Sequence, residues 1–323
     1  MYYDVISLHI KGDSVKNKTF KTLDEQIAIL RSKGLKISNE DYAKNILLRE
    51  NYFFLTGYRF LFMRSTEDRR FIEGATFEEL YAMFNFDRQI RNILFKNILI
   101  FENNMKSVSS YVVSKNHGFK EKNYLNPHNF VHDSSKNRQI NDLIHKMKRQ
   151  ISINGKQHQA TMHYMQNYGF VPLWVVVKVL SFGIMGEFYT CLQPEDKMEI
   201  AKAFRIESYE LDAYLPILAN YRNLCAHEDI TYLNRTQVSI GNTLYHKLLN
   251  VPKMDGEYIY GKNDLFALII ILKRILNEDD FNLLLNEFKY ECDILSGKLK
   301  CISIDKILDQ MGFPENYYEI ERM

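Results

Sequence analysis

The chain has 323 residues, and 46% of them are hydrophobic, which is enough for a substantial core and excludes an intrinsically disordered protein. Lys and Arg number 42 and Asp and Glu number 40, so the net charge of +2 excludes recognition of nucleic acid through the whole surface. Any such site is a local patch. With only 14 Gly and 6 Pro to interrupt long periodic segments, the sequence predicts an all-α protein.

Cysteine usage and the start of the chain indicate a cytoplasmic protein. The four cysteines lie far apart without a C-x-x-C pair, which is typical of reduced thiols. Residues 1–14 lack the basic start and apolar run of a signal peptide. The longest apolar stretch, residues 171–191, contains Lys178 and Glu187 and indicates a buried helix rather than a membrane span.

The first 75 residues predict a small helical subdomain. After a polar arm at residues 1–18, Thr22 and Glu25 form a capping box that begins a helix ending at Gly34. Residues 38–41 cap a second helix, and an aromatic-rich segment follows at 51–58. Two short helices around a glycine turn also resemble helix-turn-helix geometry, so a DNA-binding regulator stays an alternative to a docking subdomain. The few basic residues in the second helix weigh against it.

The middle of the chain predicts one long helix. Thr76 and Glu79 cap a helix, and a further helix runs from Phe86 to about Asn116, with apolar residues at the helical period from residue 90 to residue 112. Glu102 falls on or beside this apolar stripe. A carboxylate there is costly unless it is paired, so we expect an ion pair within the core.

Residues 117–191 predict loops followed by helices. A helix runs from Arg138 to Ile151, a short one carries His158 and His163, and Pro172 opens a nearly all-apolar helix. The histidines of this region form no H-E-x-x-H motif and have no nearby cysteines. We therefore expect neither a metal site nor a cofactor.

The most informative segment is residues 221–227, at the end of a helix that starts at residue 207 or 208. Pro216 begins a new turn or kinks this helix. Arg222 occupies a position where the periodic pattern calls for an apolar residue. We expect it to pair with Glu102, because two opposite charges at apolar positions most simply meet each other. Arg222 and His227 diverge by about 140° on an ideal helix. They converge on one substrate only if the helix ends near Ala226 or if a second chain completes the site.

These residue types fit phosphodiester cleavage without a metal. The planar fork of Arg222 suits a phosphate, His227 transfers protons near neutral pH, and Asn223 orients the site. A structural interpretation has equal weight at this point. It pairs a buried Arg with a carboxylate and places a His at a helix end, where the helix dipole stabilises it.

The tail predicts a polar turn at residues 254–256 and then three helices at about 263–276, 279–295 and 303–311. Gly312 and Pro314 stop the last helix. We accordingly expect three parts: an N-terminal helical subdomain at 1–75, a helical bundle at 76–235 and a C-terminal helical extension at 236–323.

A series of short motifs resembles the Abi-like (AbiD/AbiF-type) abortive-infection proteins of bacteria. The motifs occur in order at residues 30–35, 51–58, 86–91, 101–102, 172–174, 180–183, 222–227 and 234–235. Residues 264–267 and 311–314 resemble the AbiF type. The segment after His227 departs from the family, because Glu228 and Asp229 stand where a basic or aromatic segment is usual.

This resemblance implies the antiparallel helical bundle of the HEPN superfamily and its R-x4-H motif, which marks metal-independent endoribonucleases. It also implies a toxin of phage defence that a neighbouring structured noncoding RNA restrains. The alternative is a non-catalytic RNA-binding HEPN protein.

The proposed chemistry also predicts partners. We expect Arg88, Arg91 and Arg235 to contact RNA, because a nearly neutral chain needs a concentrated basic surface. One chain carries one R-x4-H motif, whereas acid–base cleavage needs two proton-transfer groups. A two-fold homodimer supplies both, and no membrane partner is expected.

Overall fold

The structure is a computed structural model that describes residues 19–323, so the polar arm predicted for residues 1–18 lies outside the described residues. Helices make up almost all of its regular structure, and the prediction of an all-α protein is confirmed. Among the described residues, the only sheet is a hairpin of β1 (Lys253–Met254) and β2 (Glu257–Tyr258). The hairpin contains the predicted turn, in which Asp255 and Gly256 both take positive φ angles of 52° and 85°.

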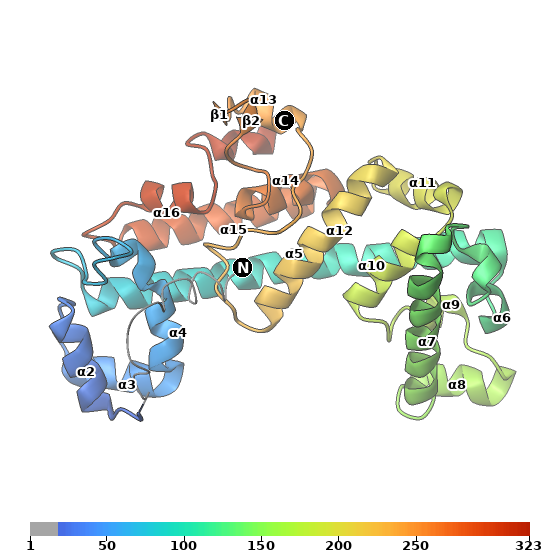
Figure 1. Ribbon diagram of the computed structural model, residues 1–323, viewed down its shortest axis with the longest axis horizontal. Helices are drawn as coiled ribbons and strands as arrows, with labels where there is room; N and C mark the ends of the chain where they lie inside the picture. Colours follow the sequence, from blue (N-terminus) through green and yellow to red (C-terminus); the bar gives the residue numbers. More distant parts are fainter. Residues whose placement is uncertain (1–18) are drawn as a thin grey trace.

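The longest element, helix α5 (Phe77–His117), forms the axis of the fold (Figure 1). Its 41 residues span about 60 Å. Thr76 caps its start in the predicted capping box with Glu79. The sequence analysis divided this region into two helices. The structure shows one, because the residues between Phe77 and Phe86 include neither Gly nor Pro.

Short helices at one end of α5 form the N-terminal part of the molecule (Figure 1). They are α2 (Leu23–Ser32), α3 (Glu40–Glu50), α4 (Tyr52–Thr56) and the 3-10 helix η1 (Gly57–Phe62). The capping box of Thr22 and Glu25 is present, and Gly34 ends the turn after α2 with φ 93°. Asn51, with φ 66°, separates α3 from α4.

The opposite end of the molecule contains a second group of helices (Figure 1). They are α6 (Glu121–Tyr124), the 3-10 helices η2 (Pro127–Asn129) and η3 (Ser134–Lys136), α7 (Asn137–Asn154), α8 (Gln159–Tyr168), α9 (Leu173–Val176) and α10 (Phe182–Cys191). The single helix predicted for residues 171–191 is wrong. Ser181 adopts an extended conformation and its side chain accepts a hydrogen bond from the backbone N–H of Ile184, which starts α10 as a separate helix.

The remaining helices complete the fold. They are α11 (Pro194–Ala203), α12 (Ser208–Ala226), α13 (Leu244–Leu248), α14 (Leu265–Ile275), α15 (Glu278–Ser296), α16 (Ile304–Gln310) and the 3-10 helix η4 (Tyr317–Arg322). Among them, α11, α12, α14 and α15 contact α5 directly. The three tail helices agree with their predicted bounds to within two residues. Pro216 lies inside α12 on its exposed side and does not end the helix.

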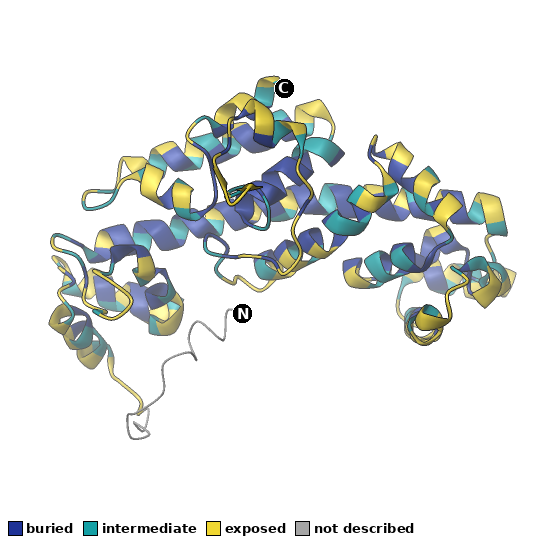
Figure 2. Ribbon diagram, turned by 45° about the horizontal axis from the view of Figure 1, so that its top comes forward, coloured by how far each residue is buried: buried dark blue, intermediate teal, exposed yellow. Residues whose placement is uncertain are grey.

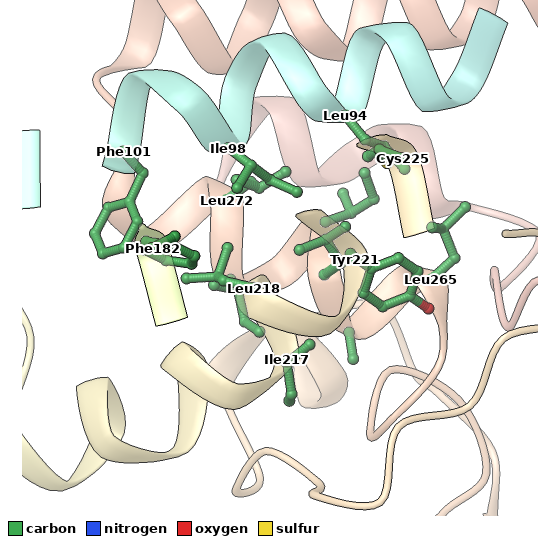
Figure 3. Packing of buried hydrophobic residues seen from close by; sticks show 14 of the residues in the cluster. Leu94, Ile98, Phe101, Phe182, Ile217, Leu218, Tyr221, Cys225, Leu265 and Leu272 are labelled. Carbon is green, nitrogen blue, oxygen red and sulfur yellow. The ribbon is translucent and has the colours of Figure 1, made fainter. Parts of the chain in front are cut away.

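One hydrophobic core runs through all of these parts. Near the middle of the molecule, Leu94 and Ile98 of α5 face Leu218 and Tyr221 of α12 and Leu272 of α14 (Figure 3). Buried residues follow the inner sides of these helices, and exposed residues cover their outer sides (Figure 2). The predicted parts 1–75, 76–235 and 236–323 all contribute to this core. Among residues 19–323, no helix has the length and apolar content that a membrane crossing needs.

Candidate functional site

The C-terminal end of α12 brings the R-x4-H residues to a defined turn. The helix ends at Ala226, and His227 leaves it with φ −100° and ψ 5°. The backbone N–H of Glu228 bonds to the carbonyl of Cys225 at 3.4 Å, and that of Asp229 bonds to the carbonyl of Leu224 at 2.9 Å. This is the Schellman arrangement, with Glu228 in the left-handed position at φ 56°. The structure thus meets the first of the two conditions for convergence, a helix end near Ala226.

Arg222 lies between α12 and α5 and is half-buried. Its Nε is 3.6 Å from Oε2 of Glu102, and its guanidinium carbon lies 5.8 Å from the centre of the Phe95 ring. The predicted pairing of Glu102 with Arg222 is confirmed. The second oxygen of Glu102 accepts a hydrogen bond from Nζ of Lys106 at 2.7 Å, so the carboxylate serves two cations.

The contact between Arg222 and Glu102 is an ion pair without a hydrogen bond. Both Arg222 Nε and Glu102 Oε2 are buried without a hydrogen-bond partner. Within residues 19–323, the terminal nitrogens of Arg222 also make no hydrogen bond. Lys106 and Arg222 carry two positive charges against the single charge of Glu102. The cluster therefore keeps an excess positive charge and unused donors, which suit an anion.

His227 and Asn223 lie at the surface of the same helix end. Both residues are exposed, and the His227 backbone N–H donates to the Asn223 carbonyl at 3.0 Å. In the part of the chain that the structure describes, neither side chain makes a hydrogen bond. The imidazole of His227 is therefore accessible to a ligand. Burial raises the pKa of the neighbouring Cys225 thiol to about 12, which makes this thiol a poor nucleophile at neutral pH.

A buried hydrogen-bond network fixes the segment that follows His227. Asp87 of α5 is fully buried and accepts hydrogen bonds from the Thr231 hydroxyl at 2.5 Å and from the backbone N–H groups of Thr231 and Tyr232 at 3.1 Å. It also accepts from the Tyr58 hydroxyl at 2.7 Å and from Arg91 at 2.5 Å. Arg91 in turn donates to the Asp229 carbonyl at 3.3 Å. The network holds the chain beyond His227 against α5 and η1.

The N-terminal helices reach the same segment. A Cβ atom on Gly57 would lie 2.5 Å from Cδ1 of Ile230, so a larger residue at this position would displace the Ile230 side chain. Arg88 donates two hydrogen bonds to Glu50 at 3.1 and 2.6 Å, which lower the pKa of the Glu50 carboxyl. A terminal nitrogen of Arg88 is also 3.8 Å from Glu228. The part before α5 therefore contributes directly to the surroundings of His227.

The three arginines predicted to contact RNA have different environments. Arg91 is only 2% exposed and pairs with Asp87. Its prediction as a surface contact to RNA is therefore wrong, because its guanidinium is buried and already bound within the protein. Arg88 stays partly exposed beside Glu50. Arg235 is exposed, but it donates to the carbonyls of Asn234 at 3.0 Å and Gln310 at 2.7 Å, which ties it to the end of α16.

Comparison with known proteins identifies the family. The model of the Abi-like protein family matches residues 45–233, which is more than half of the chain. The chain belongs to the Abi-like family. No curated protein and no solved structure matches it. The family name links this Abi-like protein to abortive-infection defence against phage, and the matched residues include both sides of the cluster, Glu102 on α5 and Arg222 and His227 on α12.

Sequence reasoning missed two residues of this Abi-like site. Lys106 is four residues after Glu102 on one helix, a spacing that places the two side chains on one face and was readable from the sequence. Asp87 likewise precedes Arg91 by four residues. Asp87 and Thr231 are 144 residues apart in the sequence, so no local pattern predicts the hydrogen bond between them. Among residues 19–323, no group of three His, Cys, Asp or Glu is placed to hold a metal ion.

Proposed function

We propose that this Abi-like protein is a metal-independent endoribonuclease that acts as a toxin in phage defence. The observation that carries the proposal is the end of α12. There a half-buried arginine with unused donors, Arg222, lies five positions before an accessible imidazole, His227. The resemblance of this segment to the R-x4-H motif of HEPN ribonucleases supports it.

The chemistry follows from these two side chains. The His227 imidazole removes the proton of a ribose 2′-hydroxyl, and the 2′-oxygen attacks the adjacent phosphorus. The bond from phosphorus to the 5′-oxygen breaks, and a protonated group supplies the proton that this leaving oxygen takes up. The products are a 2′,3′-cyclic phosphate and a 5′-hydroxyl. Arg222 binds the phosphate oxygens and stabilises the charge that develops on them in the transition state.

Glu102 and Lys106 support Arg222 in this proposal. Glu102 holds one edge of the guanidinium at Nε, and Lys106 takes up part of the carboxylate charge, so Arg222 keeps its attraction for phosphate. Asn223 lies beside His227 on the exposed side of α12 and orients the ribose or phosphate. None of these steps requires a metal ion or a cofactor.

The proposal includes a two-fold homodimer and an RNA partner. One chain supplies one accessible imidazole in this motif, and the second chain supplies the other proton-transfer group. A structured noncoding RNA from the neighbourhood of the gene restrains the toxin by occupying the site. Arg88 and Arg235, each partly or fully exposed, are the RNA contacts that we retain.

Growth of bacteria that express the protein tests the proposal. The parent slows growth, and His227→Ala and Arg222→Ala each relieve this effect at equal protein level. His132→Ala and Arg49→Ala remove one exposed imidazole and one exposed guanidinium elsewhere, and both stay toxic. The non-catalytic alternative predicts instead that RNA binding is unchanged in His227→Ala and that no cleavage or toxicity is lost. Equal toxicity of all four variants contradicts the proposal.

A further inference from the structure

A continuous row of aromatic rings lies at the end of the molecule opposite α2–α4, where α8 and α9 pack beside each other (Figure 1). The centroid of Trp174 is 5.3 Å from that of Phe119, and Phe119 is 5.8 Å from Phe170. Phe170 is 6.4 Å from Tyr168, which is 5.3 Å from Tyr164. Five rings from three separate segments thus form one surface feature, which we call the aromatic row.

The aromatic row is open to solvent. Tyr168 is 58% exposed, Trp174 45% and Phe119 38%. Core packing does not account for rings that keep this much of their surface in contact with water. Exposed rings that lie next to one another are typical of a binding surface.

Positive charge accompanies the aromatic row. Residues 115–191 contain ten Lys and Arg but only four Asp and Glu, a net charge of +6, whereas the remainder of the chain has a net charge of −4. The amine of Lys120 lies 4.7 Å from the centre of the Phe170 ring. Lys178 follows Trp174 by four residues and is exposed.

Most of the local acids are already bound, whereas most of the cations are not. Glu187 pairs with Lys146 at 2.8 Å, and Glu121 accepts the backbone N–H of Val171 at 2.7 Å. Asp133 caps the turn at Ser135. Within the described residues, eight of the ten Lys and Arg of this segment make no ion pair, since only Lys115 and Lys146 are paired. This end of the molecule therefore presents net positive charge to a partner.

We propose that the aromatic row and its lysines bind single-stranded RNA, with bases stacked on Trp174, Tyr168 and Phe119 and phosphates beside Lys120 and Lys178. Exposed rings interleaved with cations are the combination that binds single strands without sequence preference. A protein or membrane partner that only needed apolar contact would not account for the charge of this segment. This inference rests on the proposed function, since it assigns a second contact to the same RNA.

The aromatic row is distinct from the Arg222 site. Fifteen residues of α5 separate Glu102 from His117, and this distance is about 22 Å along the helix. An RNA strand that reaches the end of α12 can therefore also contact the aromatic row if it runs along α5. The aromatic row would hold the strand while the chemistry takes place elsewhere.

The sequence contains a single tryptophan, so Trp174 fluorescence reports directly on base stacking in the aromatic row. We would titrate the full-length His227→Ala variant, which leaves RNA uncut, with a single-stranded 12-mer of oligo-adenylate. Stacking should quench Trp174 at saturation. Tyr168→Ala should weaken binding about fivefold or more, whereas Tyr168→Phe keeps the ring and the affinity. Tyr290→Ala, which removes an equally exposed ring on α15, is the matched control.

Salt dependence tests the lysines separately. Replacement of Lys120 or Lys178 by Gln should each reduce the slope of log affinity against log salt by about 0.7 for a single strand. If RNA binds but the fluorescence of Trp174 is not quenched, the proposed role of the aromatic row is wrong, while the ribonuclease proposal is unaffected. Conversely, quenching by RNA that the parent protein never cleaves contradicts the ribonuclease but not the aromatic row. If Tyr168→Ala changes only the oligomeric mass in sedimentation, the surface is a protein interface and the proposal is wrong.

Discussion

Glu102 Oε2 lies 3.6 Å from Arg222 Nε, and this contact joins the long axial helix α5 to helix α12, which ends at Ala226 just before His227. The same carboxylate is closer to Lys106, at 2.7 Å on its other oxygen. Arg222 is thus the less tightly held of two cations. A buried charge that is held loosely in the folded protein is available to a ligand, whereas one that is fully paired is not.

The first prediction concerns this difference in pairing. Double-mutant cycles built with Glu102→Gln should give a larger coupling free energy with Lys106→Met than with Arg222→Gln. We expect about 1–3 kcal/mol for the first pair and under about 1 kcal/mol for the second, because only the first is hydrogen-bonded. Unfolding in urea measures both cycles. Equal or reversed couplings would show that Arg222 is a structural residue.

The second prediction concerns the network around Asp87. Asp87→Asn leaves Arg91 buried without a counter-charge, so the free energy of unfolding should fall by about 3–5 kcal/mol. Backbone amides of residues 229–232 should exchange hydrogen faster, since Asp87 accepts two of their N–H groups. Asp142→Asn, at an exposed position of α7, should change neither quantity. Unchanged exchange in Asp87→Asn would mean that the segment is held by other contacts.

The third prediction concerns the turn after His227. Glu228 has φ 56°, where a side chain costs free energy and glycine does not. Glu228→Gly should therefore stabilise the fold by about 0.5–1 kcal/mol, with a small offset from its 3.8 Å contact with Arg88. Glu195→Gly, in the first turn of α11, should destabilise by a similar amount. The pair is measured by thermal unfolding, and destabilisation by Glu228→Gly would refute the assigned turn.

The fourth prediction concerns the C-terminal extension. Asp264 caps α14, and burial raises the pKa of its carboxyl to about 6 from an unfolded value near 4. A raised folded pKa means that the native protein binds this proton more tightly, so the contribution of Asp264 to stability is lost as pH rises from about 4 to 6. Asp264→Asn keeps an oxygen that can accept the hydrogen bond of the cap. The free energy of unfolding of this variant, relative to that of the parent, should rise by about 2–3 kcal/mol between pH 4 and pH 7.5. Urea unfolding at the two pH values checks this. A difference that is independent of pH would contradict it.

The sequence predicted those features that follow from local patterns. Capping boxes at Thr22 and Thr76 depend on residues three positions apart. The pairing of Glu102 with Arg222 was predictable because each charge interrupts an apolar stripe, and two such charges have few other partners. The burial of Arg91 was not predictable in this way, since arginine side chains usually face water.

Contacts between distant segments account for the rest. The Thr231 hydroxyl reaches Asp87 across the fold, and nothing in either local sequence marks the pair. The break before Ser181 was missed for a different reason. A run of valines and leucines has the same hydrophobicity whether it forms one buried helix or two, so periodicity cannot place the boundary.

Cleavage of RNA by the purified protein in excess chelator tests the central claim most directly, with RNA that folds without Mg²⁺. The account predicts that the parent cuts the RNA and leaves 2′,3′-cyclic phosphate and 5′-hydroxyl ends. It also predicts that His227→Ala loses at least about 100-fold in rate, as expected for a general acid or base, whereas His132→Ala does not. Activity that disappears in chelator and returns with Mg²⁺ or Mn²⁺, or cleavage that survives in His227→Ala, would contradict the account.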